Sequence, residues 1–185
     1  MRYCALVLTL ALVSCSGSLQ RPATTLEIYR VTDAWHPIRV VAVAATNNEG
    51  RFRDLLATGL ASQPELEVRD AAWTASTLRD LGELRKAIFH DNRKATLLAP
   101  FGVDAVLKMS YGAREDESSH GWRIEVLSTH SGDVVAGMSL NVWQDPGEAQ
   151  MSPQIPTSGD SERAAVAASE LARLLRIAGA RTPPN

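Results

Sequence analysis

The apolar run IRVVAVAA, from Ile38 to Ala45, is the feature that most constrains the fold. Because the run is nearly continuous and rich in valine, it predicts a β-strand that is buried on both faces. The turn-forming cluster TNNEG follows it, and Arg51 to Ser62 then carries apolar residues at helical spacing. A buried strand followed by an amphipathic helix indicates an α/β domain.

The middle of the chain continues the alternation of strand and helix. Leu66 to Arg69 predicts a short strand, because its apolar residues alternate with polar ones. Thr74 to His90 predicts a second helix, and Ala95 to Phe101 predicts one further helical turn.

The second half of the chain is dominated by strands. Three alternating segments predict an antiparallel meander: Val103 to Tyr111, Trp122 to Leu127 and Val134 to Trp143. A last helix is predicted over Asp160 to Ala178, with Asp160 or Ser161 as its cap and Gly179 as its end. We therefore expect a two-layer α/β sandwich, in which helices pack on a mixed sheet in the order β-α-β-α-β-β-β-α.

Charge and composition exclude several classes of protein. The net charge of -2 and the sequence pI of about 6.1 argue against nucleic-acid binding, which requires a basic patch or stripe. The two cysteines, Cys4 and Cys15, both precede residue 16, and no zinc-binding spacing occurs. The four histidines do not lie at metal-binding spacing, and we expect His120 and His130 to be solvated. The chain carries no phosphate-loop or nucleophile motif, so we predict neither enzymatic activity, nor a cofactor, nor a bound metal.

Two groups of residues are candidates for binding. In open α/β sheets ligands bind beyond the carboxyl ends of strands, so Asn47, Asn48 and Gly50 are a candidate ligand crevice, although a plain turn is the simpler interpretation. Trp35, Trp73 and Trp143 are candidate contacts for a protein partner, because tryptophan is enriched at interface hot spots. The alternative for each tryptophan is that it closes the rim of the core.

The N-terminus has the layout of a secretory signal. Arg2 supplies a positive charge, the nine residues from Ala5 to Val13 are an apolar run, and small residues follow. The run is too short to span a bilayer, which takes about 20 apolar residues. The alternative is a buried N-terminal strand or helix.

The tetrad Leu12-Val13-Ser14-Cys15 resembles a bacterial lipobox. The resemblance implies that Cys15 becomes the acylated first residue of the mature protein and that Cys4 is removed with the signal. Ser16 stands where an aspartate would favour inner-membrane retention, so the resemblance implies an outer-membrane anchor in a Gram-negative cell. We expect a signal peptide over 1–14, the lipidated cysteine and a tether over 15–37, one domain over 38–180 and a frayed C-terminus over 181–185. Apolar residues late in the tether could form a short strand or pack on the domain.

Residues 39–143 resemble the superfamily of envelope lipoproteins that contains CsgG, LpoB and FlgO. The resemblance rests on RVVAVAATNN, RFRDLLATGLAS, LEVRDAAWTASTLRDL, LLAPFGVDAVLKMSYG and WRIEVLSTHSGDVVAGMSLNV. It implies an α/β domain that binds another envelope protein, with oligomers possible. The curli channel protein has two long membrane-inserting hairpins for which this chain has no room, so we do not expect a secretion pore.

These patterns together predict a lipoprotein anchored in the outer membrane through Cys15, on the periplasmic face. Its domain would act as a non-enzymatic binding module, serving as an assembly factor, scaffold or activator in the biogenesis of the envelope or of a surface appendage. The alternative is a small-ligand-binding or hydrolytic periplasmic domain that uses the crevice at Asn47 and Asn48.

The anchor can be tested by replacing Cys15 with serine. We expect the substitution to abolish palmitate labelling, because the thiol is the atom that would carry the lipid, and we expect processing of the unsubstituted chain to be sensitive to globomycin. Unchanged processing of Cys15→Ser would contradict the prediction.

Overall fold

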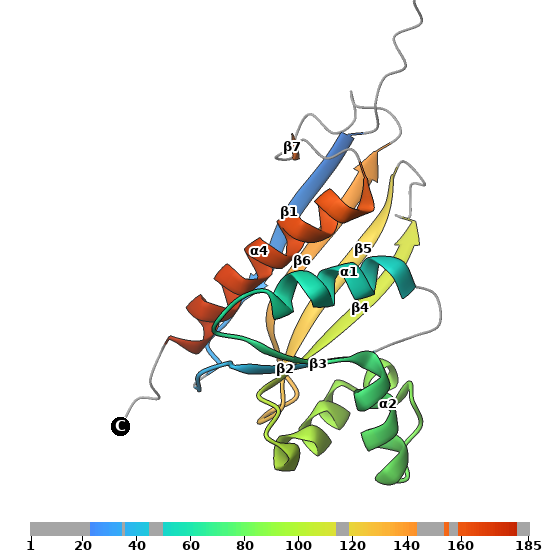
Figure 1. Ribbon diagram of the computed structural model, residues 1–185, viewed down its shortest axis with the longest axis vertical. Coiled ribbons are helices and arrows are strands. Elements are labelled where there is room, and N and C mark those ends of the chain that lie inside the picture. The colour runs from blue at the N-terminus through green and yellow to red at the C-terminus, as the bar shows by residue number, and fades with distance from the viewer. Residues whose placement is uncertain are drawn as a thin grey trace, which may run out of the picture.

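The computed structural model describes residues 23–34, 36–44, 50–113, 119–143, 154–155 and 159–180. They form one seven-stranded sheet in the order β3-β2-β4-β5-β6-β1-β7, with helices packed on it (Figure 1). The elements, in chain order, are β1 (Ala23–Val31), β2 (Val40–Val43), α1 (Gly50–Ala61), β3 (Glu67–Arg69), α2 (Ala71–Asp80), α3 (Ala87–His90), the 3₁₀ helix η1 (Asn92–Phe101), β4 (Ala105–Ala113), β5 (Ser119–Ser128), β6 (Val134–Trp143), β7 (Gln154–Ile155) and α4 (Asp160–Gly179).

The sheet is mixed, as the sequence predicts. β2 runs parallel to both β3 and β4, and β4, β5 and β6 form the predicted antiparallel meander. β1 then pairs antiparallel with β6. The predicted class, an α/β fold with helices on a mixed sheet, is confirmed.

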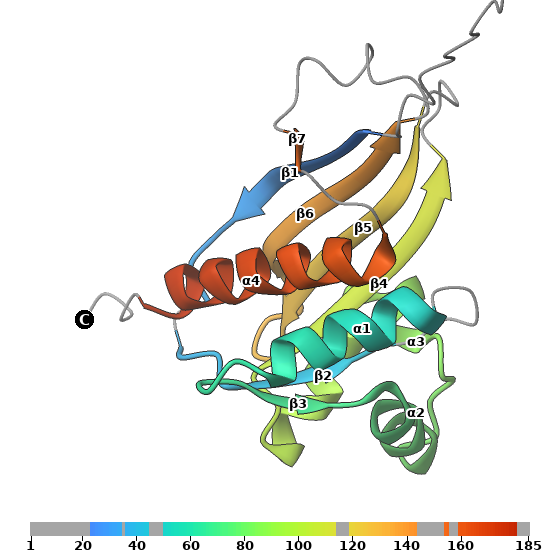
Figure 2. The same ribbon diagram turned by 45° about the horizontal axis from the view of Figure 1, so that its top comes forward.

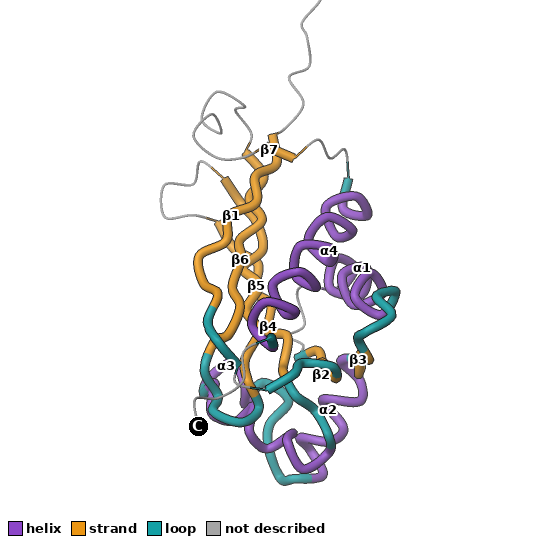
Figure 3. The backbone as a smooth tube through the Cα atoms, turned by 90° about the vertical axis from the view of Figure 1, so that its left-hand side faces the viewer, coloured by secondary structure: helices purple, strands orange, loops and turns teal. Residues whose placement is uncertain are grey.

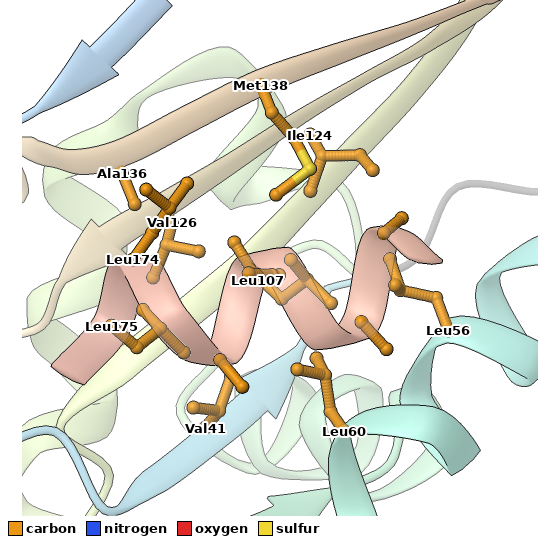
Figure 4. Close-up of a cluster of buried hydrophobic side chains, with 14 of the residues drawn as sticks. Val41, Leu56, Leu60, Leu107, Ile124, Val126, Ala136, Met138, Leu174 and Leu175 are labelled. Carbon is orange, nitrogen blue, oxygen red and sulfur yellow. The ribbon is translucent and has the colours of Figure 1, made fainter. Parts of the chain in front are cut away.

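α1 and α4 cover one face of the sheet and lie side by side (Figures 2 and 3). The helices approach closely at Gly59, where an added Cβ would lie 2.7 Å from the Cβ of Ala168. The apolar side chains of both helices meet those of the strands in one cluster (Figure 4). The predicted buried stripe of α4 is confirmed, since these residues are all buried: Ala164, Ala167, Ala168, Leu171, Leu174, Leu175 and Ala178.

The other face of the sheet is covered at the end occupied by β2 and β4. Val41 and Val43 point toward α1 and α4, whereas Ala42 belongs to a second apolar cluster that includes Leu78 and Leu98. α2, α3 and η1 supply this second cover. β2 is therefore buried on both faces, which is the physical reason for its continuous apolar sequence.

The structure divides the predicted helix over Thr74 to His90 into α2 and α3. The break falls at Gly82, whose φ of 77° lies in the left-handed region that favours glycine. The periodicity of the segment does not reveal the break, because apolar residues continue on both sides of it.

The ends of α4 differ from the prediction. Gly159 occupies the N-cap position and makes no side-chain cap, in place of the predicted Asp160 or Ser161. Gly179 is the last helical residue rather than the residue that ends the helix. An added Cβ at Gly179 would lie 3.0 Å from the backbone nitrogen of Ile38, so close packing explains this glycine.

The predicted tether over residues 15–37 contains a strand of the sheet. β1 pairs with β6 over almost its full length and carries a bulge between Ile28 and Arg30. The ordered domain therefore includes residues from Ala23 onward, and the prediction that it starts at Ile38 is wrong. The polar residues of β1 obscure its strand character, because β1 lies near the edge of the sheet and is exposed from Ile28 to Val31. Residues 1–22, Trp35 and the C-terminus over 181–185 lie outside the described residues.

Hydrogen bonds of Asp104, the residue before β4, connect the start of β2 to β4 and to the β5–β6 turn. Its Oδ2 accepts hydrogen bonds from the backbone N–H groups of Arg39 and Val40, at 2.8 and 2.9 Å. Its own N–H donates to the carbonyl oxygen of Val40. Its carbonyl oxygen accepts from both the N–H and the hydroxyl of Thr129, at 3.0 and 2.9 Å. One residue thus joins three segments that are distant in sequence.

We predict that Asp104→Ala lowers the free energy of unfolding by about 3 kcal/mol, because two backbone donors lose a charged acceptor. Asp104→Asn keeps an acceptor oxygen and is expected to lose less. Asp80→Ala is the matched control, since Asp80 is exposed, and we expect a change within about 0.5 kcal/mol. Urea unfolding measures all three variants, and equal losses for Asp104→Ala and Asp80→Ala would contradict the role of Asp104.

Candidate functional site

A cavity of about 330 Å³ lies beside the start of α1, next to the predicted crevice. Gly50, the first residue of α1, lines the cavity, and so does Asp160, the first residue of α4. The two helices therefore begin at the same end of the molecule. Asn47 and Asn48, the other predicted crevice residues, lie outside the described residues.

Aromatic rings form the floor and one wall of this cavity, which we call the aromatic pocket. Phe52 and Trp122 stack with their ring centres 4.1 Å apart, and both are buried. The ring centre of Tyr111 lies 5.2 Å from that of Trp122, and the ring of His120 meets Tyr111 edge-on at 6.0 Å. Tyr111 is 48% exposed, so its ring is open to a ligand while the stacked pair beneath supports it.

Two arginines give the aromatic pocket its charge. Arg163 is held in place, since its Nε donates to the hydroxyl of Thr24 at 3.1 Å and its Nη1 pairs with Asp160 at 3.3 Å. Arg51 is exposed and has no hydrogen-bonding or ionic partner among the described residues. The pocket can therefore contact a flat apolar group and one anionic or hydrogen-bonding group. Its described lining contains no serine, threonine or cysteine that could serve as a nucleophile.

Trp73 lies on α2, at the end of the molecule that is lowest in Figures 1 and 2. It is partly buried, with the guanidinium carbon of Arg69 5.6 Å from its ring centre and the ring of Phe101 edge-on at 6.4 Å. Three large apolar side chains are exposed at this end: Leu84 at 75%, Phe101 at 47% and Leu81 at 43%. We call this set, together with Trp73, the apolar end. The sequence indicates Trp73 but none of the other three, because Leu81 and Leu84 fall inside the continuous helix predicted over Thr74 to His90 and Phe101 ends the predicted helical turn.

Trp143 does not form a contact surface. It is 7% exposed and its Nε1 donates to the hydroxyl of Thr25 at 2.9 Å, across the β1–β6 pair. The structure therefore supports the alternative interpretation, in which this tryptophan closes the rim of the core.

A polar cluster on the outer face of the sheet was not predicted. Tyr29 lies over Gly137, where an added Cβ would approach its ring to 2.5 Å. Arg123 sits 4.8 Å from the Tyr29 ring centre and bonds both the Tyr29 hydroxyl and Glu125. Burial and the charge of Glu125 raise the pKa of Tyr29 to about 12, so the phenol remains a donor at neutral pH. The cluster ties β1 to β5, and no spacing in the sequence indicates it.

The histidines are not grouped as metal ligands. His130 is exposed, as predicted, but its ring centre lies 3.9 Å from that of His36 in a cavity of about 630 Å³. His120 lines the aromatic pocket and is only partly exposed, so the prediction that it is solvated is incomplete. Over the described ranges, no set of three or more histidine, cysteine or acidic side chains is placed to hold a metal ion. The helices in the same part of the chain are too short or too polar to cross a membrane.

Comparisons with known proteins give no family assignment, since no family model and no curated protein matches the chain. Solved structures with a similar chain path include PelC from Paraburkholderia phytofirmans, described as a dodecamer, at 16% identity and a TM-score of 0.45, covering 82% of this chain and 97% of that one. They also include the C-terminal domain of LpoB from Salmonella enterica, at 14% identity and a TM-score of 0.47, covering 60% and 87%. A lipoprotein from Neisseria meningitidis is similar at 16% identity and a TM-score of 0.41, covering 75% and 98%.

These similarities concern the path of the chain and support no inference about activity or partner, because every identity is far below 25% and every TM-score is below 0.5. LpoB is one of the three proteins that the sequence resembles. The resemblance to CsgG and FlgO stays a prediction.

The geometry of the aromatic pocket predicts that substitutions of its residues lower the free energy of unfolding by different amounts. Phe52→Ala removes a ring that is 3% exposed and is expected to cost about 3–5 kcal/mol of unfolding free energy. Tyr111→Ser removes a half-exposed ring, and we expect a loss below about 1.5 kcal/mol. Thermal or urea unfolding tests both variants. A loss at Tyr111 as large as that at Phe52 would show that Tyr111 is part of the core and not an open wall.

Proposed function

We propose that this protein is a lipoprotein, anchored through Cys15 in the outer membrane, whose periplasmic domain binds another envelope protein without catalysing a reaction. It would act as an assembly factor, scaffold or activator in the biogenesis of the envelope or of a surface appendage. The lipobox-like tetrad supports the anchor, and the apolar end supports the binding.

The observation that carries the proposal is the exposure of Leu81, Leu84 and Phe101 at the end of the molecule that holds α2, with Phe101 edge-on to Trp73. Single exposed apolar residues are ordinary on protein surfaces, but a group of large ones marks an interaction site. Trp73 adds a partly buried aromatic ring next to an arginine, the two residue types most enriched at binding hot spots.

The position of the apolar end fits an anchored protein. Ala23, the start of β1, lies eight residues after Cys15, and eight residues span at most about 29 Å. The start of β1 and the helix α2 lie at opposite ends of the molecule in all three views (Figures 1, 2 and 3). An anchor at Cys15 would therefore hold the start of β1 near the membrane and present the apolar end to the periplasm.

A second candidate function is the binding of a small ligand in the aromatic pocket. The half-exposed ring of Tyr111 favours it, together with Arg51, which lines the same cavity and has no partner among the described residues. Hydrolysis has less support than binding, because the described lining offers no nucleophile. Loss of ligand binding in Tyr111→Ser, with the fold retained, would separate this function from the first.

The binding function can be tested by photo-crosslinking in cells that produce the full chain with p-benzoylphenylalanine in place of Phe101. The replacement is aromatic and the site is exposed, so we expect the fold to tolerate it. We expect an adduct with another envelope protein, reduced at least fivefold by Leu84→Asp, because a buried carboxylate opposes an apolar contact.

Ile177→Asp is the matched control, since Ile177 is 46% exposed but lies on α4, outside the apolar end. It is expected to leave the yield of adduct within twofold. The absence of any protein adduct, or equal losses in the two variants, would contradict the proposed function.

A further inference from the structure

A groove of about 400 Å³ runs between α2 and the turn that follows it. Ala72, Ala75 and Ser76 form its α2 side, and Leu84 forms the other side. Their spacing places Ala72, Ala75, Ser76 and Arg79 on one face of α2, while Thr74, Thr77 and Leu78 are buried against the domain. The groove therefore has small residues on one side and, on the other, a leucine that is 75% exposed.

The charges that line this groove are unbalanced. Glu83 is its only described carboxylate, and Glu83 is already paired with Lys94. Arg79 donates to the hydroxyl of Ser76 at 3.2 Å, and neither Arg79 nor Arg85 has a carboxylate partner among the described residues. Two guanidinium groups therefore border an apolar groove with their charge not neutralised.

The segment that surrounds the groove also carries an excess of positive charge. Residues 69–94 contain six arginines and lysines against four acidic residues, whereas the whole chain has a net charge of -2. The excess of positive charge is thus local to the region that carries the groove. A local field of this kind selects partners of the opposite sign and speeds their encounter.

We propose that this groove docks an acidic, amphipathic segment of a partner protein. Apolar side chains of that segment would lie on Ala72, Ala75 and Leu84, and its carboxylates would pair with Arg79 and Arg85. The small side chains on α2 let a backbone approach closely, as in other cases where an amphipathic helix lies in a groove. This inference rests on the proposed binding function and adds the chemistry of the partner. A lipid surface is the less favoured occupant, since α2 lies at the opposite end of the molecule from the start of β1 (Figure 2).

The test uses the full chain in cells, with p-benzoylphenylalanine in place of Leu84, whose large apolar side chain lines the groove and is 75% exposed. The cross-linked peptide of the partner is identified by mass spectrometry. We expect it to be rich in acidic and apolar residues, and we expect Arg79→Glu combined with Arg85→Glu to reduce the adduct at least tenfold.

Lys86→Glu is the matched control, because Lys86 is exposed in the same segment but does not line the groove. It is expected to change the yield less than threefold. Far-ultraviolet circular dichroism and the unfolding midpoint of each variant confirm that the fold is intact.

Four outcomes would overturn the inference: a neutral or basic cross-linked segment, a lipid adduct, an adduct with a second copy of the chain alone, or a yield that the double charge reversal does not change. The absence of an adduct from the probe at Leu84 would also overturn it. If the adduct from Phe101 persists in that case, the proposed binding function stands and only the groove and its acidic partner are rejected. If both adducts are absent, both proposals fail.

Discussion

The hydrogen bonds of Asp104 are the constraint on which the arrangement of the sheet depends. β2 is only four residues long, and long connections separate it from its neighbours β3 and β4. Specific hydrogen bonds are therefore needed to hold β2 in its place in the sheet. The carboxylate of Asp104 fixes the start of β2 through two consecutive backbone N–H groups. Its carbonyl oxygen fixes the β5–β6 turn through Thr129.

Two glycines shape the surfaces that carry the aromatic pocket and the apolar end. Gly59 lets α1 pack closely on α4, and both helices begin at the aromatic pocket. Gly82 ends the run of α2 and turns the chain back, which exposes Leu84 beside α2. Gly59 thus lets the two helices close over the sheet, and Gly82 leaves a large apolar side chain uncovered.

Sequence patterns predicted most of the fold because burial imposes periodicity. Continuous valines in β2, alternation in β4 to β6 and the alanine–leucine stripe of α4 each follow from which faces meet the core. β1 was missed as a full strand because its second half is exposed, and exposure removes the apolar alternation. The split of the second helix was missed because a single glycine, whose φ the sequence does not reveal, decides it. Trp73 and Gly50 were found from residue type and position alone, whereas Arg51, Tyr111 and Leu84 were not.

The sequence alone determined the α/β class, the order of most elements and the lipobox-like Cys15, because these depend on short-range pattern and composition. The tertiary structure decided which side chains remain uncovered. It buried Trp143 against Thr25 and opened Tyr111 above a stacked Phe52 and Trp122. Among the residues that the structure describes, it gave Arg79 and Arg85 no acidic partner. The physical reason is that exposure and charge compensation depend on residues brought together from distant parts of the chain, and no local pattern encodes those contacts.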